Sequence, residues 1–235
     1  MKKSCCIIIP IYNKNPNPSE LVSIGRAMDI FSQSYDMVYV CGNSLDVSVY
    51  PELKVIRFDN SFFKSNKSYS KLLLSEKFYA PFIEYEYMLI AQTDSYVLNA
   101  KHSLDDFINK GYDYWGAPWP DGPITKPYTI KDIIKLIMLR KIRKVRVGNG
   151  GFSLRRVSTM FSLIEKNRTY LKLMWWFNED LFFSRECMKM GTVAPVEEAR
   201  SFAGEQDIEE SINNGNIPYG VHAYEKYYPQ LKRLI

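Results

Sequence analysis

The chain has 235 residues, of which 46% are hydrophobic, 14% aromatic and 24% charged. This composition is typical of a globular protein with a core of ordinary size, and it excludes a disordered chain. No stretch approaches the roughly 20 apolar residues that a membrane-spanning helix requires, so we expect any membrane contact to be peripheral.

The net charge of +5 is concentrated in one segment. Residues 126–146 carry eight Lys or Arg residues and one Asp, so the segment sums to 8 − 1 = +7 and the remainder to 5 − 7 = −2. Local basicity predicts one anionic partner surface, and it argues against a protein that coats nucleic acid. Isoleucines on one helical face of this segment are typical of a helix that lies on an anionic membrane. An internal helix packed on the sheet is the alternative.

The cysteine pattern indicates a reducing compartment, because it has neither CxxC spacing nor the density of a disulfide scaffold. The start of the chain imitates a signal peptide, but Pro10 and Asn13 interrupt the apolar run and no small-residue cleavage site follows. We therefore expect a cytoplasmic protein, attached at most peripherally to the inner face of the membrane. The cysteines are Cys5, Cys6, Cys41 and Cys187.

Strand and helix patterns alternate in the first half of the sequence. Apolar, β-branched runs bounded by turn residues predict buried strands, and apolar residues at helical spacing predict helices. The expected elements are a strand at 5–11, a helix opened by Ser19-Glu20 and reaching Ser32, strands at 37–41 and 54–58, a helix at 69–82, and a strand at 87–91. This order predicts an α/β fold with a central, mostly parallel sheet flanked by helices, whose ligands lie outside the carboxyl ends of the strands.

The second half of the sequence does not continue this regular alternation of strands and helices. Proline and glycine breaks follow Asp121, and after the basic segment we expect a helix at 157–166 and another that opens at Asn178. From Gly191 the sequence has little regular periodicity, and we expect it to wrap back over the sheet.

Four short segments contain residues suited to chemistry. Asp94 follows an apolar strand, where a carboxylate can hold a divalent cation, although a simple turn is the commoner use of such a residue. Residues 148–151, Gly-Asn-Gly-Gly, can bring the backbone close to a ligand or form a hairpin turn. Asp180 can serve as a general base, or complement the dipole of a helix capped by Asn178. His222 can be a ligand or a structural histidine.

These segments lie within six blocks that resemble, in this order, a glycosyltransferase of the GT-A type. The similarity covers nearly the whole chain and is closest to a bacterial family catalogued as domain of unknown function 5672. The blocks are Ile7–Asn13, Leu89–Asp94, Tyr112–Trp119, Val147–Arg155, Asn178–Asp180 and Gly220–Ala223.

The resemblance implies a role for each segment. Asp94 and His222 would hold Mn²⁺ or Mg²⁺ on the donor diphosphate, and the loop at Gly150 and Gly151 would line the sugar pocket. Asp180 would take the acceptor proton. One departure is Gln92, which replaces the first acid of the usual metal motif. An amide is a poorer cation ligand than a carboxylate, so weak metal dependence is an open alternative.

The remaining expected site residues follow the same resemblance. Those expected at the donor nucleotide are Ile11, Tyr12, Asn13, Gln92, Thr93 and Asp94, with Asp59 or Asn43 near the nucleoside. Trp115, Trp119 and Asn178 are expected at the acceptor, and Glu179 is a second catalytic candidate beside Asp180.

The function implied is transfer of a sugar from a nucleotide-sugar, expected to be a UDP-sugar, to a glycan or lipid-linked acceptor, with inversion, in bacterial surface polysaccharide or lipopolysaccharide synthesis. Residues 1–120 would form the donor half and residues 121–235 the acceptor and catalytic half of one domain. A catalytically silent sugar-binding module is the alternative, since Gln92 weakens the metal site. A nucleotidyltransferase is disfavoured, because residues 13–18 hold no glycine-rich phosphate loop.

Overall fold

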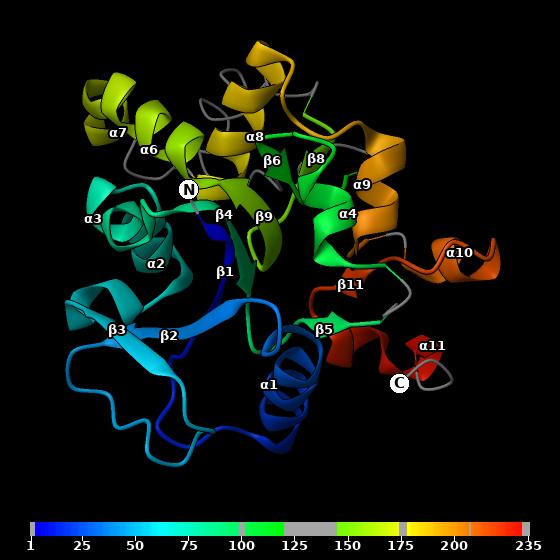
Figure 1. The fold of residues 1–235 in the computed structure, drawn as a ribbon, viewed down its shortest axis with the longest axis horizontal. Coiled ribbons are helices and arrows are strands. Elements are labelled where there is room, and N and C mark those ends of the chain that lie inside the picture. Colours follow the sequence, from blue (N-terminus) through cyan, green and yellow to red (C-terminus); the bar gives the residue numbers. More distant parts are fainter. Residues whose placement is uncertain (1–2, 99–101, 120–144, 174–177, 207, 232–235) are drawn as a thin grey trace, which may run out of the picture.

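The computed structural model describes residues 3–98, 102–119, 145–173, 178–206 and 208–231. Within them the chain forms a three-layer α/β fold around a six-stranded sheet of order β3-β2-β1-β4-β9-β6 (Figure 1). The strands are β1 (Lys3–Pro10), β2 (Asp36–Gly42), β3 (Lys54–Phe58), β4 (Tyr85–Ala91), β6 (Tyr114–Trp115) and β9 (Phe152–Arg156).

The sheet is mixed. Strands β3, β2, β1 and β4 are parallel, as expected from their continuous apolar runs, but β9 is antiparallel to both β4 and β6. The sheet is therefore mostly parallel, as expected, with β9 as the strand of opposite direction. Strand β9 enters the sheet directly from the glycine loop, so its direction follows from the position of that loop beside the end of β4.

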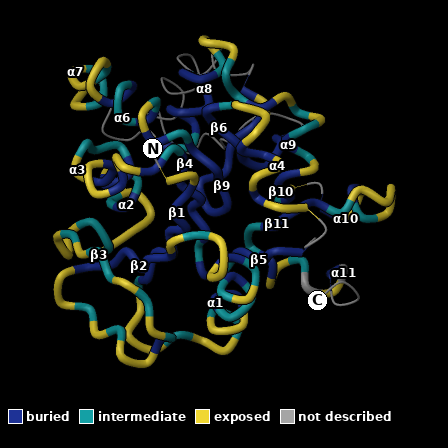
Figure 2. Tube along the Cα trace, viewed as in Figure 1, coloured by how far each residue is buried: buried dark blue, intermediate teal, exposed yellow. Residues whose placement is uncertain are grey.

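Helices cover both faces of the sheet, and Figure 2 shows the buried strands between them. One face packs against α1 (Pro18–Phe31), α4 (Leu104–Ile108) and α9 (Val196–Phe202). The other packs against α2 (Asn66–Leu73), α3 (Glu76–Tyr79), α6 (Val157–Lys166) and α8 (Glu179–Met190). The shorter helical segments are η1 (Asn60–Phe63), η2 (Ala80–Phe82), α7 (Arg168–Leu173), α10 (Ile208–Asn213), η3 (Tyr224–Tyr227) and α11 (Tyr228–Leu231).

Two helices differ from expectation at their ends. Helix α1 is capped by Asn17 and not by Ser19: Asn17 Oδ1 accepts the Glu20 amide at 2.8 Å, and Glu20 accepts the Asn17 amide at 2.8 Å. The single helix expected at 69–82 is divided, because Ser75 bonds back to the Leu72 carbonyl at 2.6 Å and the chain restarts as α3.

Two small sheets lie outside the large one. Strands β10 (Ala203–Gly204), β11 (Gly220–Val221) and β5 (Tyr96–Val97) form one, and β7 (Ala117–Pro118) pairs with β8 (Val147–Gly148) in the other. The C-terminal third therefore does return to the body of the fold, through α9 and β11, although its periodicity predicts neither.

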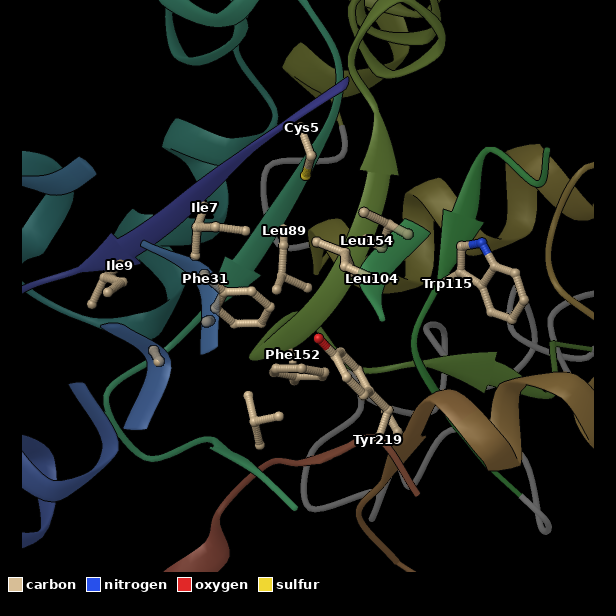
Figure 3. Close-up of a cluster of buried hydrophobic side chains, with 14 of the residues drawn as sticks. Cys5, Ile7, Ile9, Phe31, Leu89, Leu104, Trp115, Phe152, Leu154 and Tyr219 are labelled. Atoms are coloured by element: carbon tan, nitrogen blue, oxygen red, sulfur yellow. The ribbon is translucent and has the colours of Figure 1, made fainter. Parts of the chain in front are cut away.

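The core on the α1 side is drawn in Figure 3. Alternate residues of β1 and β4 meet Phe31 and Tyr219, and Phe152 and Trp115 extend the cluster toward α4 and α9. The basic segment 126–146 lies outside the described residues except for Val145 and Arg146. None of the helices in the described ranges has both the length and the hydropathy that a membrane span requires.

Candidate active site

The chain turns sharply where β4 ends. The Gln92 amide donates to the Gly151 carbonyl at 2.8 Å, which extends the β4–β9 pairing by one residue. Ser95 then closes the turn through its amide and its hydroxyl, both on the Gln92 carbonyl, at 2.8 and 2.7 Å. Thr93 is buried and donates to Glu20 at 3.0 Å. Asp94 is thereby held at the tip of the turn, with 48% of its side chain exposed.

His222 lies directly beside Asp94. Strands β5 and β11 pair antiparallel, with Val221 opposite Tyr96, and the Tyr224 amide donates to the Asp94 carbonyl at 3.0 Å. This register places His222 Nε2 3.4 Å from Asp94 Oδ1. Residues separated by 128 positions (222 − 94) therefore meet through two short strands.

Glu205 is the third member of this group, and no sequence motif marks it. Strand β10 pairs parallel to β11, and the His222 amide donates to the Gly204 carbonyl at 3.2 Å. Glu205 Oε1 then lies 3.3 Å from His222 Nδ1, and Glu205 Oε2 accepts the indole N–H of Trp119 at 3.2 Å.

The two carboxylates control the charge of the imidazole. Burial disfavours the protonated ring, but hydrogen bonds and charge from Asp94 and Glu205 outweigh it and raise the pKa of His222 to about 9. Burial acts to raise the pKa of Asp94, but the hydrogen bond and the charge of His222 hold this pKa below its ordinary value.

The glycine loop connects two sheets, so the hairpin alternative is wrong: β8 pairs with β7, whereas β9 pairs with β4. Asn149 adopts a φ of 71° and its Oδ1 accepts the Gly151 amide at 2.7 Å. A Cβ at Gly150 would overlap with Glu179 Oε1, and one at Gly151 would overlap with the His222 ring. Glycine is required at both positions because the loop touches these two side chains directly.

The two acids that open α8 have different surroundings. Glu179 is buried and accepts the Ser70 hydroxyl at 2.6 Å and the Arg155 guanidinium at 3.4 Å. Asp180 is only partly buried, and its Oδ1 accepts the Leu181 amide at 2.6 Å. Burial and the neighbouring charge of Glu179 raise the pKa of Asp180 to about 7. Asn178 occupies the N-cap position without a side-chain cap, and it is exposed.

Arg155 is a buried cation that the sequence did not single out. Its side chain has no exposed surface, and it contacts Ser153 Oγ at 3.0 Å and Tyr79 Oη at 3.5 Å in addition to Glu179. The Tyr114 ring lies 5.6 Å from the guanidinium. An unpaired buried charge is costly, so Arg155 and Glu179 each require the other.

The residues expected at the nucleotide lie at the end of β1. Ile11 is fully buried, and its amide pairs with the Val40 carbonyl at 2.9 Å. The partly buried Tyr12 ring packs edge-on against Tyr69, with centroids 5.4 Å apart. Asn13 is exposed, and its carbonyl accepts the Tyr50 hydroxyl at 2.6 Å.

Asn43 and Asp59 lie beyond the ends of β2 and β3. Both are exposed. Asp59 caps η1 by accepting the Ser61 amide at 2.8 Å, so the structure gives it a local helix-capping contact.

The tryptophans expected at the acceptor are both covered. Trp115 is fully buried against Phe107 and Phe202, and Figure 3 shows it at one side of the core cluster. The structure therefore gives Trp115 a packing position with no ring face for a sugar. Trp119 is 7% exposed; its ring lies against Gly148 and its N–H is directed to Glu205.

Asp94 and His222 are spaced to provide two ligands of a divalent cation, whose other coordination positions would be filled by a bound ligand. Two cis donors on such an ion lie about 3 Å apart, close to the 3.4 Å between Asp94 Oδ1 and His222 Nε2. No group of three or more His, Cys, Asp or Glu side chains in the described part of the chain is arranged to hold a metal ion. The remaining positions would fall to a diphosphate and water, as is usual for Mg²⁺ bound with phosphates.

Three of the solved structures with a similar fold are glycosyltransferases. The mannosyltransferase Ktr4p from S. cerevisiae in complex with GDP has a TM-score of 0.53 and 11% identity, over 78% of this chain and 66% of that chain. Core-mannan synthase A from Aspergillus fumigatus, in a Mn/GDP form, has a TM-score of 0.54 and 8% identity over 81% and 72%. A glycosyltransferase involved in glycosylation of the major capsid of PBCV-1 has a TM-score of 0.50 and 10% identity over 98% of both chains.

At these identities the likeness shows the fold alone. No curated protein has significant sequence similarity to this chain. A family model described as "Protein of unknown function (DUF5672)" matches residues 52–222, which is well over half of the 235 residues. The chain therefore belongs to the DUF5672 family.

Proposed function

We propose that this protein is a glycosyltransferase of the GT-A type that moves a sugar from a nucleotide-sugar to an acceptor hydroxyl. The observation that carries this proposal is the contact of two consecutive glycines with two different segments. Gly150 lies against Glu179, and Gly151 lies against His222, which pairs with Asp94. The residues to which we assign metal binding and the sugar loop, and the start of the helix that carries our candidate base, thus belong to one locality beyond β4, where ligands bind in α/β sheets.

The chemistry is a single displacement at the anomeric carbon. The acceptor oxygen forms a bond to this carbon while the bond from carbon to the diphosphate oxygen breaks, and its electron pair leaves with the diphosphate. The acceptor proton goes to a carboxylate of the protein. Attack from the side opposite the leaving group inverts the configuration.

Asp180 suits the role of base better than Glu179. Both oxygens of Glu179 are engaged, one by Ser70 and one by Arg155. Asp180 keeps exposed surface, and its pKa of about 7 lets it hold a proton transiently near neutral pH. Glu179 then has a structural role: its contact with Arg155 of β9 holds the start of α8 in place.

A divalent cation bound at Asp94 and His222 would supply positive charge to the departing diphosphate. The chain itself orients the donor. Tyr12 offers an aromatic ring beside the end of β1, and burial, with a smaller contribution from the charge of Asp94, raises the pKa of its hydroxyl well above the ordinary value. Asn149 Nδ2 is buried and has no hydrogen-bond partner within the described residues, while its Oδ1 is fixed by the Gly151 amide. We assign this donor to a sugar hydroxyl.

The finer assignments follow as parts of the same proposal. Residues 1–120 would bind the donor and residues 121–235 would supply the base and the acceptor site. The donor would be a UDP-sugar and the acceptor a glycan or lipid-linked sugar of bacterial surface polysaccharide or lipopolysaccharide. Segment 126–146 would bring the cytoplasmic protein to an anionic membrane.

Nucleotide release from a panel of sugar donors tests the proposal. Protein is incubated with UDP-, GDP- and CMP-sugars, with Mn²⁺ or with EDTA, and free nucleotide is measured by chromatography. We expect one donor to release nucleotide above the buffer control, and Asp180→Asn to reduce this release. Nucleotide binding without release or transfer would favour a silent sugar-binding module. Absence of both binding and release would overturn the proposal.

A further inference from the structure

We infer that Glu205 is a positioning residue that orients the imidazole of His222 toward the metal side of the site. This deepens the proposed function and rests on the metal pair assigned above. Glu205 lies on Nδ1 of the ring at 3.3 Å, while Asp94 lies on Nε2 at 3.4 Å. The two carboxylates therefore contact different nitrogens of one histidine.

The backbone places Glu205 there. Gly204 is opposite Val221 in the parallel pair of β10 and β11, so the residues that follow, Glu205 and His222, are neighbours. The His222 amide donates to the Gly204 carbonyl at 3.2 Å and continues this register. Because main-chain pairing fixes both Cα positions, the contact does not depend on a chance arrangement of two long side chains.

The geometry determines which nitrogen is left for the metal. A metal-bound histidine usually donates its other N–H to a carboxylate, which fixes the ring orientation and the tautomer. Here Nδ1–H is directed at Glu205 and Nε2 faces Asp94, so Nε2 is the nitrogen that a cation would bind in place of its proton. Without Glu205, the ring of His222 would keep the contact of Nε2 with Asp94 and the packing against Gly151 but would lose the contact on Nδ1.

Glu205 is itself held from the opposite side. Its second oxygen accepts the indole N–H of Trp119 at 3.2 Å, and the Trp119 ring lies against Gly148. The Trp119 amide donates to the Arg146 carbonyl at 2.7 Å, which attaches the tryptophan to the start of the glycine loop. This gives Trp119 a function as support for Glu205 in place of the expected acceptor stacking.

Two other roles for Glu205 are less consistent with the contacts. A direct metal ligand would have to reach the Nε2 side of His222, but the two carboxylate oxygens of Glu205 contact Nδ1 of His222 and the indole N–H of Trp119. A general base needs a free oxygen for the acceptor proton, and both oxygens of Glu205 are engaged. Its action therefore goes through His222.

The test compares Mn²⁺ affinity among variants that differ at this one contact. Mn²⁺ is titrated into the protein alone and into the protein with UDP or GDP, followed by electron paramagnetic resonance. We expect Glu205→Ala to weaken Mn²⁺ binding by about 10- to 100-fold, the usual effect of losing such a carboxylate. Glu205→Gln should lose less, because its amide oxygen can still accept the Nδ1–H.

Matched variants separate positioning from folding. Glu198 is another partly buried glutamate, paired with Lys110 at 2.7 Å away from the site, and Glu198→Ala should leave Mn²⁺ affinity unchanged. Asp94→Asn serves as the variant of a direct ligand. Melting temperatures of all variants are measured in parallel.

Three outcomes decide the inference. Weaker Mn²⁺ binding in Glu205→Ala, with partial recovery in Glu205→Gln, supports it even where no sugar donor is turned over. Unchanged Mn²⁺ affinity in a folded Glu205→Ala protein overturns it while leaving the transferase proposal intact. Absence of Mn²⁺ binding by the wild-type protein under every condition overturns it as well.

Discussion

Replacing Asp180 by Asn should make the protein more stable at alkaline pH. Burial and the charge of Glu179 raise the pKa of Asp180 from 3.8 to about 7. The difference between these two pKa values, 7 − 3.8 or about 3, means that the ionised carboxylate destabilises the folded state by about 4 kcal/mol at high pH. This is an upper limit, because the carboxyl is partly exposed. The asparagine keeps the shape and can still accept the Leu181 amide.

The sign of the pH dependence follows from proton binding. Between about pH 4 and pH 7 the folded protein holds a proton on Asp180 that the unfolded chain has lost, so stability falls as pH rises through this range. The charges that act on this carboxyl are Glu179, Arg155 and Glu205. The stability of the Asn variant relative to wild type should therefore increase by about 2 to 3 kcal/mol between pH 5 and pH 8. Urea unfolding at the two pH values measures it.

The adjacent acid provides the control. Glu179→Gln removes the partner of a fully buried Arg155, so it should destabilise the fold by about 3 to 5 kcal/mol. Substitution of these two neighbouring acids is thus expected to change the stability in opposite directions: Asp180→Asn raises it at alkaline pH and Glu179→Gln lowers it.

Asp180→Asn should lower the activity although it raises the stability at alkaline pH. Without a proton acceptor, transfer should fall by roughly 100-fold or more, equivalent to about 2.7 kcal/mol of barrier. The wild-type rate should rise with pH and level off above about 7, as the carboxyl loses its proton. An Asn variant with normal turnover and no gain in stability at pH 8 would refute the reasoning.

Three further predictions, together with one comparison substitution in α1, concern the loop and the basic segment. Gly151→Ala should destabilise the fold by about 1 to 3 kcal/mol in thermal melts and weaken Mn²⁺ binding, because its methyl group displaces the His222 ring. For comparison, Gly25→Ala in α1, where the added Cβ meets nothing within 4 Å, should stabilise the fold by about 0.5 to 1 kcal/mol in the same measurement. Asn149→Asp keeps the bond to the Gly151 amide but removes the unpartnered donor, so the KM for the sugar nucleotide should rise by about 10-fold in steady-state kinetics; an unchanged KM would mean that the amide does not contact the donor. Residues 126–146 should give salt-sensitive pelleting with anionic vesicles, at about 1 kcal/mol per engaged basic side chain, and equal pelleting of a variant with four Gln substitutions would return the segment to a structural role. The four positions are Arg140, Lys141, Arg143 and Lys144.

The sequence was most informative where a single periodic run determines an element. Strand β3 and helix α6 have the predicted limits, and β1, β2 and β4 lie within two residues of theirs. Their apolar runs are continuous because both faces of these strands are buried. The divided helix after Asn66 could not be predicted from period alone, because local bonding of Ser75 competes with the helical pattern.

The site was predictable only for residues with a recognisable local pattern. Asp94, Gly150, Gly151 and His222 each lie in or beside a turn-forming stretch next to a strand, and the structure brings them together in the candidate site. Glu205 has no such pattern: its position depends on two-residue strands that form only when distant segments pair.

The buried network beneath the loop was missed for a related reason. Arg155 occupies a strand position at which a cation is normally exposed, and only the fold reveals Glu179 beneath it. In the same way, the sequence shows that Trp115 is aromatic but does not reveal that Phe107 and Phe202 enclose it.

The central claim is that a nucleoside diphosphate binds where these segments meet. The most direct measurement is a crystal structure of the protein soaked with Mn²⁺ and with UDP, GDP or CMP in turn. We predict that the diphosphate lies between the pair formed by Asp94 and His222 and the loop at Gly150 and Gly151, with the base near Tyr12. A nucleotide bound elsewhere, or no bound nucleotide at millimolar concentration, would contradict the account.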